Sequence, residues 1–217
     1  YLFKSGSPSC GMERVPVYRP QGGAPARRGV GLYAEQILAA RPELPCEEEG
    51  RLGDPRLREN FLERVFAYHR WRALCAAGGT AARRAAFHEQ HRWVRLAHAP
   101  EPARRLGRLV AEAGRRPAAA RVAAYARGFM AVLRRPVSRR SHGHVLRQLA
   151  GFLARALDPE ERAELTERIH AYRAGQVPLL VPLTLLRHHF RRHPQPDLAG
   201  QTYLEPHPHE LLLRQGP

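Results

Sequence analysis

Strong helix-start signals after residue 53 constrain the fold of this chain more than any other feature. Asp158-Pro159-Glu160-Glu161 places a capping Asp, a first-turn Pro and a Glu three residues after the cap. This arrangement satisfies free backbone amides at a helix N-terminus reciprocally. Asp54-Pro55 repeats its first half. The two sites predict one helix that Gly175 closes and another from residue 55 to about residue 74.

The rest of the chain extends this helical pattern. Further helices are expected over residues 80–98, 102–113, 117–133, 142–157 and 182–193. Residues 1–51 instead carry short apolar pieces separated by Gly and Pro, which suits loops and a remnant of an α/β unit. Gly78-Gly79 marks the expected boundary. The predicted fold class is mainly α, with an all-helical domain over residues 78–217 preceded by a truncated α/β remnant over residues 1–77.

Positive charge is concentrated in the second part of the chain. The formal net charge is +16 and the isoelectric point is near 11.2, which favours polyanionic partners. Residues 1–72 carry 12 Lys and Arg against 9 Asp and Glu, whereas residues 73–217 carry 24 against 11. Codon bias toward Arg and Ala would also explain the overall charge, because Lys4 is the sole lysine.

The density of arginine between residues 104 and 140 is harder to explain by codon bias. Arg127 and ten other arginines there face one acidic residue, Glu112. Ordinary solvated helix faces mix charges of both signs, so this run favours a surface that contacts phosphate groups. The predicted RNA-binding residues are Arg104, Arg105, Arg108, Arg115, Arg116, Arg121, Arg134, Arg135, Arg139 and Arg140.

The three cysteines, Cys10, Cys46 and Cys75, are too few and too scattered for a disulfide framework. A reducing cytoplasm is therefore expected. No apolar run reaches the roughly 20 residues that span a bilayer, so no membrane partner is expected. Because the chain begins at Tyr1 without an initiator Met, we expect a fragment of a longer protein.

The acidic, histidine and aromatic residues each allow more than one interpretation. Glu47-Glu48-Glu49 could act in acid/base catalysis, although adjacent carboxylates more often form a solvated charge run or tie two domains together. His189 and His193 have the i,i+4 spacing of a chelating pair, but no partner pattern accompanies them. We favour histidines beside arginines on an RNA-facing surface. Of Phe87 and Trp93, one is expected to be buried and the other exposed for stacking on bases.

Several motifs resemble one protein family. Ser141-His142-Gly143-His144-Val145-Leu146, the run from Gln176 to His189 and Gln201-Thr202-Tyr203-Leu204-Glu205-Pro206-His207-Pro208 resemble the C-terminal YbgA-type domain of two-domain bacterial thiouridine desulfidases. Lys4-Ser5-Gly6-Ser7-Pro8-Ser9-Cys10-Gly11 resembles the end of the desulfidase domain that precedes it. The resemblance covers almost the whole chain.

The resemblance implies an activity for the parent protein. Such proteins convert 4-thiouridine in tRNA to uridine at a [4Fe-4S] cluster, with the helical domain binding the tRNA. Cys10 matches one of the three cysteines that hold this cluster. The other two belong to motifs absent from this chain, so Cys46 and Cys75 are interpreted as structural, and we expect no stable cluster and no activity in this chain alone.

The oligomeric state and the catalytic base are not predicted. The alternative to part of an enzyme is a non-enzymatic basic helical module that binds nucleic acid or an acidic protein partner.

Overall fold

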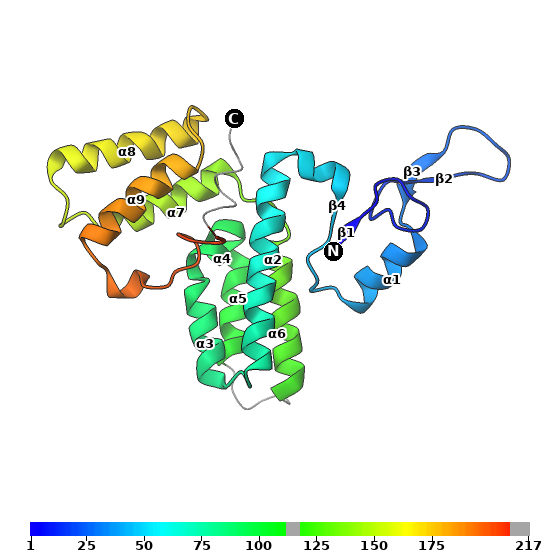
Figure 1. The fold of residues 1–217 in the computed structure, drawn as a ribbon, viewed down its shortest axis with the longest axis horizontal. Coiled ribbons are helices and arrows are strands. Elements are labelled where there is room, and N and C mark those ends of the chain that lie inside the picture. Colours follow the sequence, from blue (N-terminus) through cyan, green and yellow to red (C-terminus); the bar gives the residue numbers. More distant parts are fainter. Residues whose placement is uncertain (112–117, 209–217) are drawn as a thin grey trace. The chain divides into compact units, whose positions relative to one another are not determined.

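A computed structural model describes residues 1–111 and 118–208 (Figure 1). Within these residues the fold is mainly helical, as predicted. The chain forms two compact units: unit 1 combines residues 1–78 with residues 118–134, and unit 2 combines residues 79–111 with residues 135–208. One division between the units falls at Gly78-Gly79. That residues 78–217 fold as an independent domain stays a prediction. No helix of the described part combines the length and the apolar character that a membrane crossing requires.

The N-terminal part of unit 1 is a small α/β arrangement. Strand β1 (Leu2–Phe3) pairs in parallel with β4 (Glu47–Glu48), and β2 (Val15–Val17) pairs antiparallel with β3 (Ala26–Gly29). Helix α1 (Leu32–Ala40) contributes Ala34 to a core with Phe3 and Cys46. Half-buried Cys10 packs against this core. The desulfidase origin of this segment stays a prediction.

Two long helices complete unit 1. The short helix η1 (Glu49–Gly53) leads into α2 (Pro55–Ala76), whose first turn is capped by Asp54 as predicted. Helix α6 (Ala118–Leu133) packs against α2. Trp71 of α2 contacts Tyr125 of α6, with ring centroids 5.0 Å apart. The buried Asn60 side chain donates to the Leu133 carbonyl over 2.9 Å and satisfies the end of α6.

Unit 2 begins with three short helices. The prediction of a single helix over residues 80–98 is wrong, because two separate helices occupy these residues. Helices α3 (Ala81–Gln90) and α4 (Arg92–His98) are separate, and α5 (Pro100–Ala111) follows. The break falls at His91, which is 1% exposed. Its Nδ1 lies 2.8 Å from the Phe87 carbonyl, and its ring packs against the Phe87 ring with centroids 4.1 Å apart.

The second half of unit 2 consists of α7 (Arg139–Gly151), α8 (Pro159–Ala174) and α9 (Leu180–Arg192), which contact one another (Figure 1). Helix α8 has the predicted capping box and a left-handed Gly175 at its end. Helix α7 begins earlier than predicted because Ser138 caps it, and residues 152–157 form turns instead of continuing it. These helices enclose a core that includes Leu146, Leu149, Leu153, Leu165, Ile169 and Leu186.

The last described segment of unit 2 closes this arrangement. After the short helix η2 (Pro196–Leu198), the Thr202 amide and hydroxyl both donate to the Gln90 carbonyl, over 2.9 and 3.1 Å. The Gln201 side chain donates to the Glu89 carbonyl over 3.0 Å. These bonds satisfy the end of α3 at the point where the helix breaks.

Candidate functional site

Cys10 lies in a tight turn that is fixed from within. The Cys10 amide donates to the Ser7 hydroxyl over 3.1 Å, and the Gly11 amide donates to the Ser7 carbonyl over 2.8 Å. The Cys10 thiol lies 3.6 Å from the Ser9 hydroxyl and is partly exposed. The small residues around Cys10 thus form a compact turn that leaves the thiol partly accessible at the edge of the core.

The N-terminus of α1 supports this turn from one side. Its first amides have no side-chain cap, and they donate to backbone carbonyls of the turn instead. The Leu32 amide donates to the Pro8 carbonyl over 3.2 Å, and the Tyr33 amide donates to the Ser9 carbonyl over 2.9 Å. Gly31 allows this approach, because a Cβ there would lie 2.7 Å from the Cys10 amide nitrogen and still closer to the Ser9 carbonyl group.

A buried carboxylate supports the turn from the other side. Glu48 is 2% exposed. One of its oxygens accepts from the Met12 and Glu13 amides over 2.8 and 3.2 Å, and the other accepts from the Ser5 hydroxyl over 3.1 Å. Each hydrogen bond accepted in this way stabilises a carboxylate that burial shields from solvent. Glu48 therefore links β4 to both sides of the Cys10 turn.

The neighbouring carboxylates have separate partners. Glu47 is buried and forms an ion pair with Arg51, with 2.7 Å between Glu47 Oε1 and Arg51 Nε. Its other oxygen lies 3.6 Å from the Arg64 guanidinium on α2. Glu49 is exposed and pairs with Lys4 over 2.8 Å, and hydrogen bonds from Lys4 and the Ser5 amide lower its pKa. The acidic run is therefore neither a solvated charge run nor a cluster of adjacent catalytic carboxylates. It holds the segment of Cys10 to β4 and α2.

The described residues of this chain do not form a complete cluster site. No group of three or more His, Cys, Asp or Glu side chains able to hold a metal ion occurs within residues 1–111 and 118–208. Cys46 is buried beside Phe3, and burial raises the pKa of its thiol, so it stays protonated at neutral pH. Cys75 lies near the end of α2 and is exposed. The assignment of Cys10 as a cluster ligand stays a prediction.

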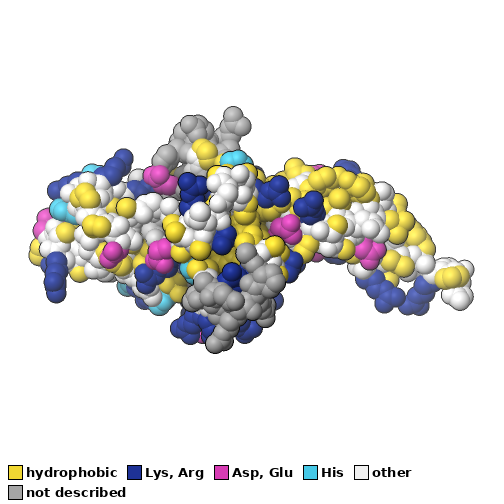
Figure 2. All heavy atoms as spheres, turned by 90° about the horizontal axis from the view of Figure 1, so that it is seen from below, with side chains coloured by type: hydrophobic (Ala, Val, Ile, Leu, Met, Phe, Trp, Pro, Cys, Tyr) yellow, Lys and Arg dark blue, Asp and Glu magenta, His cyan; other side chains and the backbone are white. Residues whose placement is uncertain are grey.

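The predicted RNA-binding arginines are distributed over both units. In unit 2, Arg104, Arg105 and Arg108 are exposed on α5, where Ala103 and Leu106 are buried. Arg104 pairs with Glu101 on the same helix. In Figure 2 the Lys and Arg side chains are spread over the visible face, and fewer Asp and Glu side chains lie among them.

A second exposed group of arginines lies at the start of α7. Arg135, Arg139 and Arg140 are exposed there, and Arg135 is fixed by a bond of 2.7 Å from His98 Nδ1 to its carbonyl. Arg147 is also exposed, two turns after Arg140 on the same face, and the sequence prediction missed it. The i,i+7 spacing was the signal that could have identified it.

The remaining predicted arginines belong to unit 1 or fall outside the described residues. Arg134 is exposed and donates to the Pro42 carbonyl over 3.2 Å, while Arg121 on α6 is half-buried. Arg127 is exposed on the same helix. Arg115 and Arg116 lie outside the residues that the structure describes.

The aromatic and histidine predictions need correction. Phe87 and Trp93 are each 3% exposed, so neither is available to stack on a base, because α3 and α4 both turn these rings into unit 2. His189 is also buried, and this burial lowers its pKa, so it is a neutral core residue and not part of an RNA-facing surface. His144 is exposed and contacts Gln148 over 2.6 Å.

The helical part of the chain matches known sequences. Residues 93–208 match a family described as "Protein of unknown function (DUF1722)". The chain is 31% identical to the "Uncharacterized protein YbgA" of Escherichia coli (strain K12) over 160 residues, which is 73% of this chain and 95% of that protein. No solved structure matches. These similarities confirm the predicted YbgA-type domain: the chain belongs to the DUF1722 family.

Proposed function

We propose that this chain is part of a tRNA 4-thiouridine desulfidase in which its helical part binds the tRNA. The observation that carries the RNA-binding half is the density of exposed arginine on α5 and at the start of α7 in unit 2. Each guanidinium can donate to phosphate oxygens in a planar fork. The run from residue 104 to residue 140 holds one acidic residue, and of the α5 group Arg104 pairs with Glu101, an exposed ion pair on the same helix that phosphate can replace.

The desulfidase half of the proposal rests on Cys10 and its motif. The turn is supported by Ser7, by α1 and by the buried Glu48, so the backbone that carries Cys10 is held in place before any ligand binds. Such preorganisation suits a metal-ligating thiolate. The remaining cluster ligands would come from a part of the parent protein that this chain lacks.

Salt-dependent tRNA binding tests the RNA-binding half. Two triple variants remove the two groups: Arg104, Arg105 and Arg108 to Ala on α5, and Arg139, Arg140 and Arg147 to Ala on α7. The matched control replaces Arg19, Arg27 and Arg28 with Ala. These three arginines are exposed on the β2–β3 hairpin, and their replacement removes the same charge as each helix variant.

Affinity should fall steeply as salt rises from about 50 to 200 mM, because bound arginines release condensed counterions. Each helix variant should weaken binding and flatten the slope of log affinity against log salt by roughly two to three units. The hairpin variant should change both much less. Equal effects of all three variants would show that binding depends on net charge alone and would contradict a defined tRNA surface.

A second function is favoured by one specific observation. The relative from Escherichia coli is covered over 95% of its length, while 27% of this chain lies outside that match. A protein can therefore consist almost wholly of the matched part. This favours a helical module that binds nucleic acid without a desulfidase domain attached. Binding of tRNA by this chain combined with no desulfidation by the full parent protein would select this alternative.

A further inference from the structure

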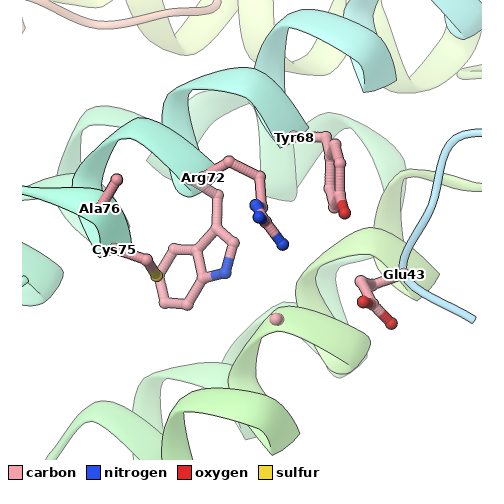
Figure 3. A pocket seen from close by; sticks show the side chains of 7 residues that line it. Glu43, Tyr68, Arg72, Cys75 and Ala76 are labelled. Carbon is pink, nitrogen blue, oxygen red and sulfur yellow. The ribbon is translucent and has the colours of Figure 1, made fainter. Parts of the chain in front are cut away.

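A pocket of about 180 Å³ opens in unit 1 between α2, α6 and the loop that follows α1. The sequence prediction did not identify it. Its walls include Glu43, Tyr68, Trp71, Arg72, Ala76 and Ala126 (Figure 3). None of these residues takes part in the Cys10 turn or in the arginine groups of unit 2.

The aromatic wall of the pocket is rigid. Trp71 is 3% exposed, and its ring rests against Tyr125 of α6. Tyr68 lies one helical turn earlier on α2 and is half-buried, with its hydroxyl directed toward the open space (Figure 3). Tyr68 is therefore the ring that offers accessible flat apolar surface to a planar guest at a low entropic cost, while the buried Trp71 backs the wall of the pocket.

Two groups of opposite charge lie at the same opening. Arg72 extends its guanidinium from α2, and the Glu43 carboxylate faces it from the loop after α1 (Figure 3). Among residues 1–111 and 118–208, neither side chain has a hydrogen-bond or ion-pair partner. A cationic guest would meet Arg72 and an anionic guest would meet Glu43. The pocket therefore favours a neutral ring that offers both donors and acceptors on its edge.

The volume limits the size of that ring. Sites for drug-sized ligands usually measure roughly 300 to 1,000 Å³. A pocket of about 180 Å³ instead suits a single planar group. Aromatic and guanidinium planes with a few polar groups are the surroundings in which proteins hold unstacked bases.

We propose that this pocket binds one unstacked nucleobase of an RNA strand. The base would stack on Tyr68, with the buried Trp71 behind it in the pocket wall. Its N–H group would donate to the Glu43 carboxylate, and its carbonyl oxygen would accept from Arg72. That the base belongs to an RNA strand rests on the proposed function. That the pocket accepts a nucleobase rests on the residues that line the pocket.

Tryptophan fluorescence provides a local readout. The chain has two tryptophans, so a Trp93→Phe variant leaves Trp71 as the sole one. Three probes are compared: a short single-stranded RNA, an abasic strand of the same length, and free uridine. The RNA should quench Trp71 saturably, uridine should quench at higher concentration, and the abasic strand should not quench.

A pocket-filling variant tests the site independently of fluorescence. Ala76 is exposed at the end of α2 and lines the pocket, so Ala76→Leu fills the opening without disturbing the core. The control is Ala73→Leu, an exposed position on the same helix that does not line the pocket. Ala76→Leu should weaken single-stranded RNA binding by about tenfold, the effect of losing one stacked base, while Ala73→Leu leaves it unchanged.

The outcomes separate this proposal from RNA binding itself. Strong tRNA binding with no quenching of Trp71 and no effect of Ala76→Leu would overturn the pocket and leave the arginine surface intact. Quenching by uridine that Ala76→Leu abolishes, combined with no tRNA binding at low salt, would overturn the RNA source of the base and retain the nucleobase site. Equal quenching by RNA and the abasic strand would show that phosphate, not a base, occupies the pocket.

Discussion

Gly31→Ala should loosen the Cys10 turn, and the size of the effect follows from the contacts. An added Cβ would lie 2.7 Å from the Cys10 amide nitrogen and closer to the Ser9 carbonyl group, so backbone has to move. Such overpacking costs about 1–3 kcal/mol, and loss of a bond from the α1 amides adds about 0.5–1.5 kcal/mol. Lower entropy of the unfolded chain returns about 0.4–1 kcal/mol. Unit 1 should therefore lose about 0.5–4 kcal/mol, with a midpoint of about 2 kcal/mol.

Gly53→Ala is the matched control for this prediction. Nothing lies within 4 Å of a Cβ at Gly53, so that variant should be neutral or slightly more stable. Urea unfolding is followed by Trp71 fluorescence in the Trp93→Phe background. In a Cys75→Ser background, which removes the exposed thiol, Cys10 should also react faster with a thiol reagent in Gly31→Ala than in Gly53→Ala. Equal unfolding midpoints and equal thiol reactivity would refute the support of the Cys10 turn by α1.

Three further predictions concern buried polar groups. Glu48→Ala leaves three donors without their acceptor and should destabilise unit 1 by about 2–4 kcal/mol in urea unfolding. Glu49→Ala removes an exposed ion pair and should cost about 0–1 kcal/mol. Similar losses in the two variants would contradict the support of the Cys10 turn by Glu48. Burial, and to a smaller extent the charge of Arg95, lower the pKa of His88 to about 4. Because the unfolded chain binds this proton more tightly, the free energy of unfolding of unit 2 should fall by about 1–2 kcal/mol as pH falls from 6.5 toward 4, after allowance for partial exposure. A His88 pKa near 6.5 by NMR titration would contradict this. Thr202→Val keeps the hydrogen bond from the residue 202 amide to the Gln90 carbonyl but removes the one from the hydroxyl, and thermal melts should show a loss of about 0.5–1.5 kcal/mol in stability. An unchanged melt would argue that the hydroxyl does not stabilise the end of α3.

Features that depend on a few adjacent residues could be predicted from the sequence. The capping box at Asp158 and the closing Gly175 are complete within one segment, and both ends of α8 were therefore predicted correctly. The start of α2 at Asp54-Pro55 is of the same kind. Exposed arginines on α5 were also predictable, because charged side chains are seldom buried without a partner.

The support of the Cys10 turn depends on residues far apart in the sequence. Glu48 is 36 residues from Met12, and the parallel pairing of β1 with β4 brings it to the turn. A run of three glutamates gives no local indication that each will have a different partner. One signal was available: Gly31 precedes α1 where a capping Ser, Thr, Asp or Asn is usual, which indicates that the α1 amides bind another group.

The break at His91 shows why local periodicity fails in unit 2. Residues 80–98 have no Pro or Gly, so local sequence predicts one continuous helix. A break there leaves the Glu89 and Gln90 carbonyls without helical donors, which is unfavourable unless other donors reach them. Gln201 and Thr202 supply those donors from 112 residues further along the chain. The same C-terminal segment contacts α7, where the Tyr203 hydroxyl lies 2.9 Å from His142 Nδ1. Two of the motifs that carry the family resemblance thus contact each other within unit 2, so part of the resemblance in these motifs reflects the packing of the helical part.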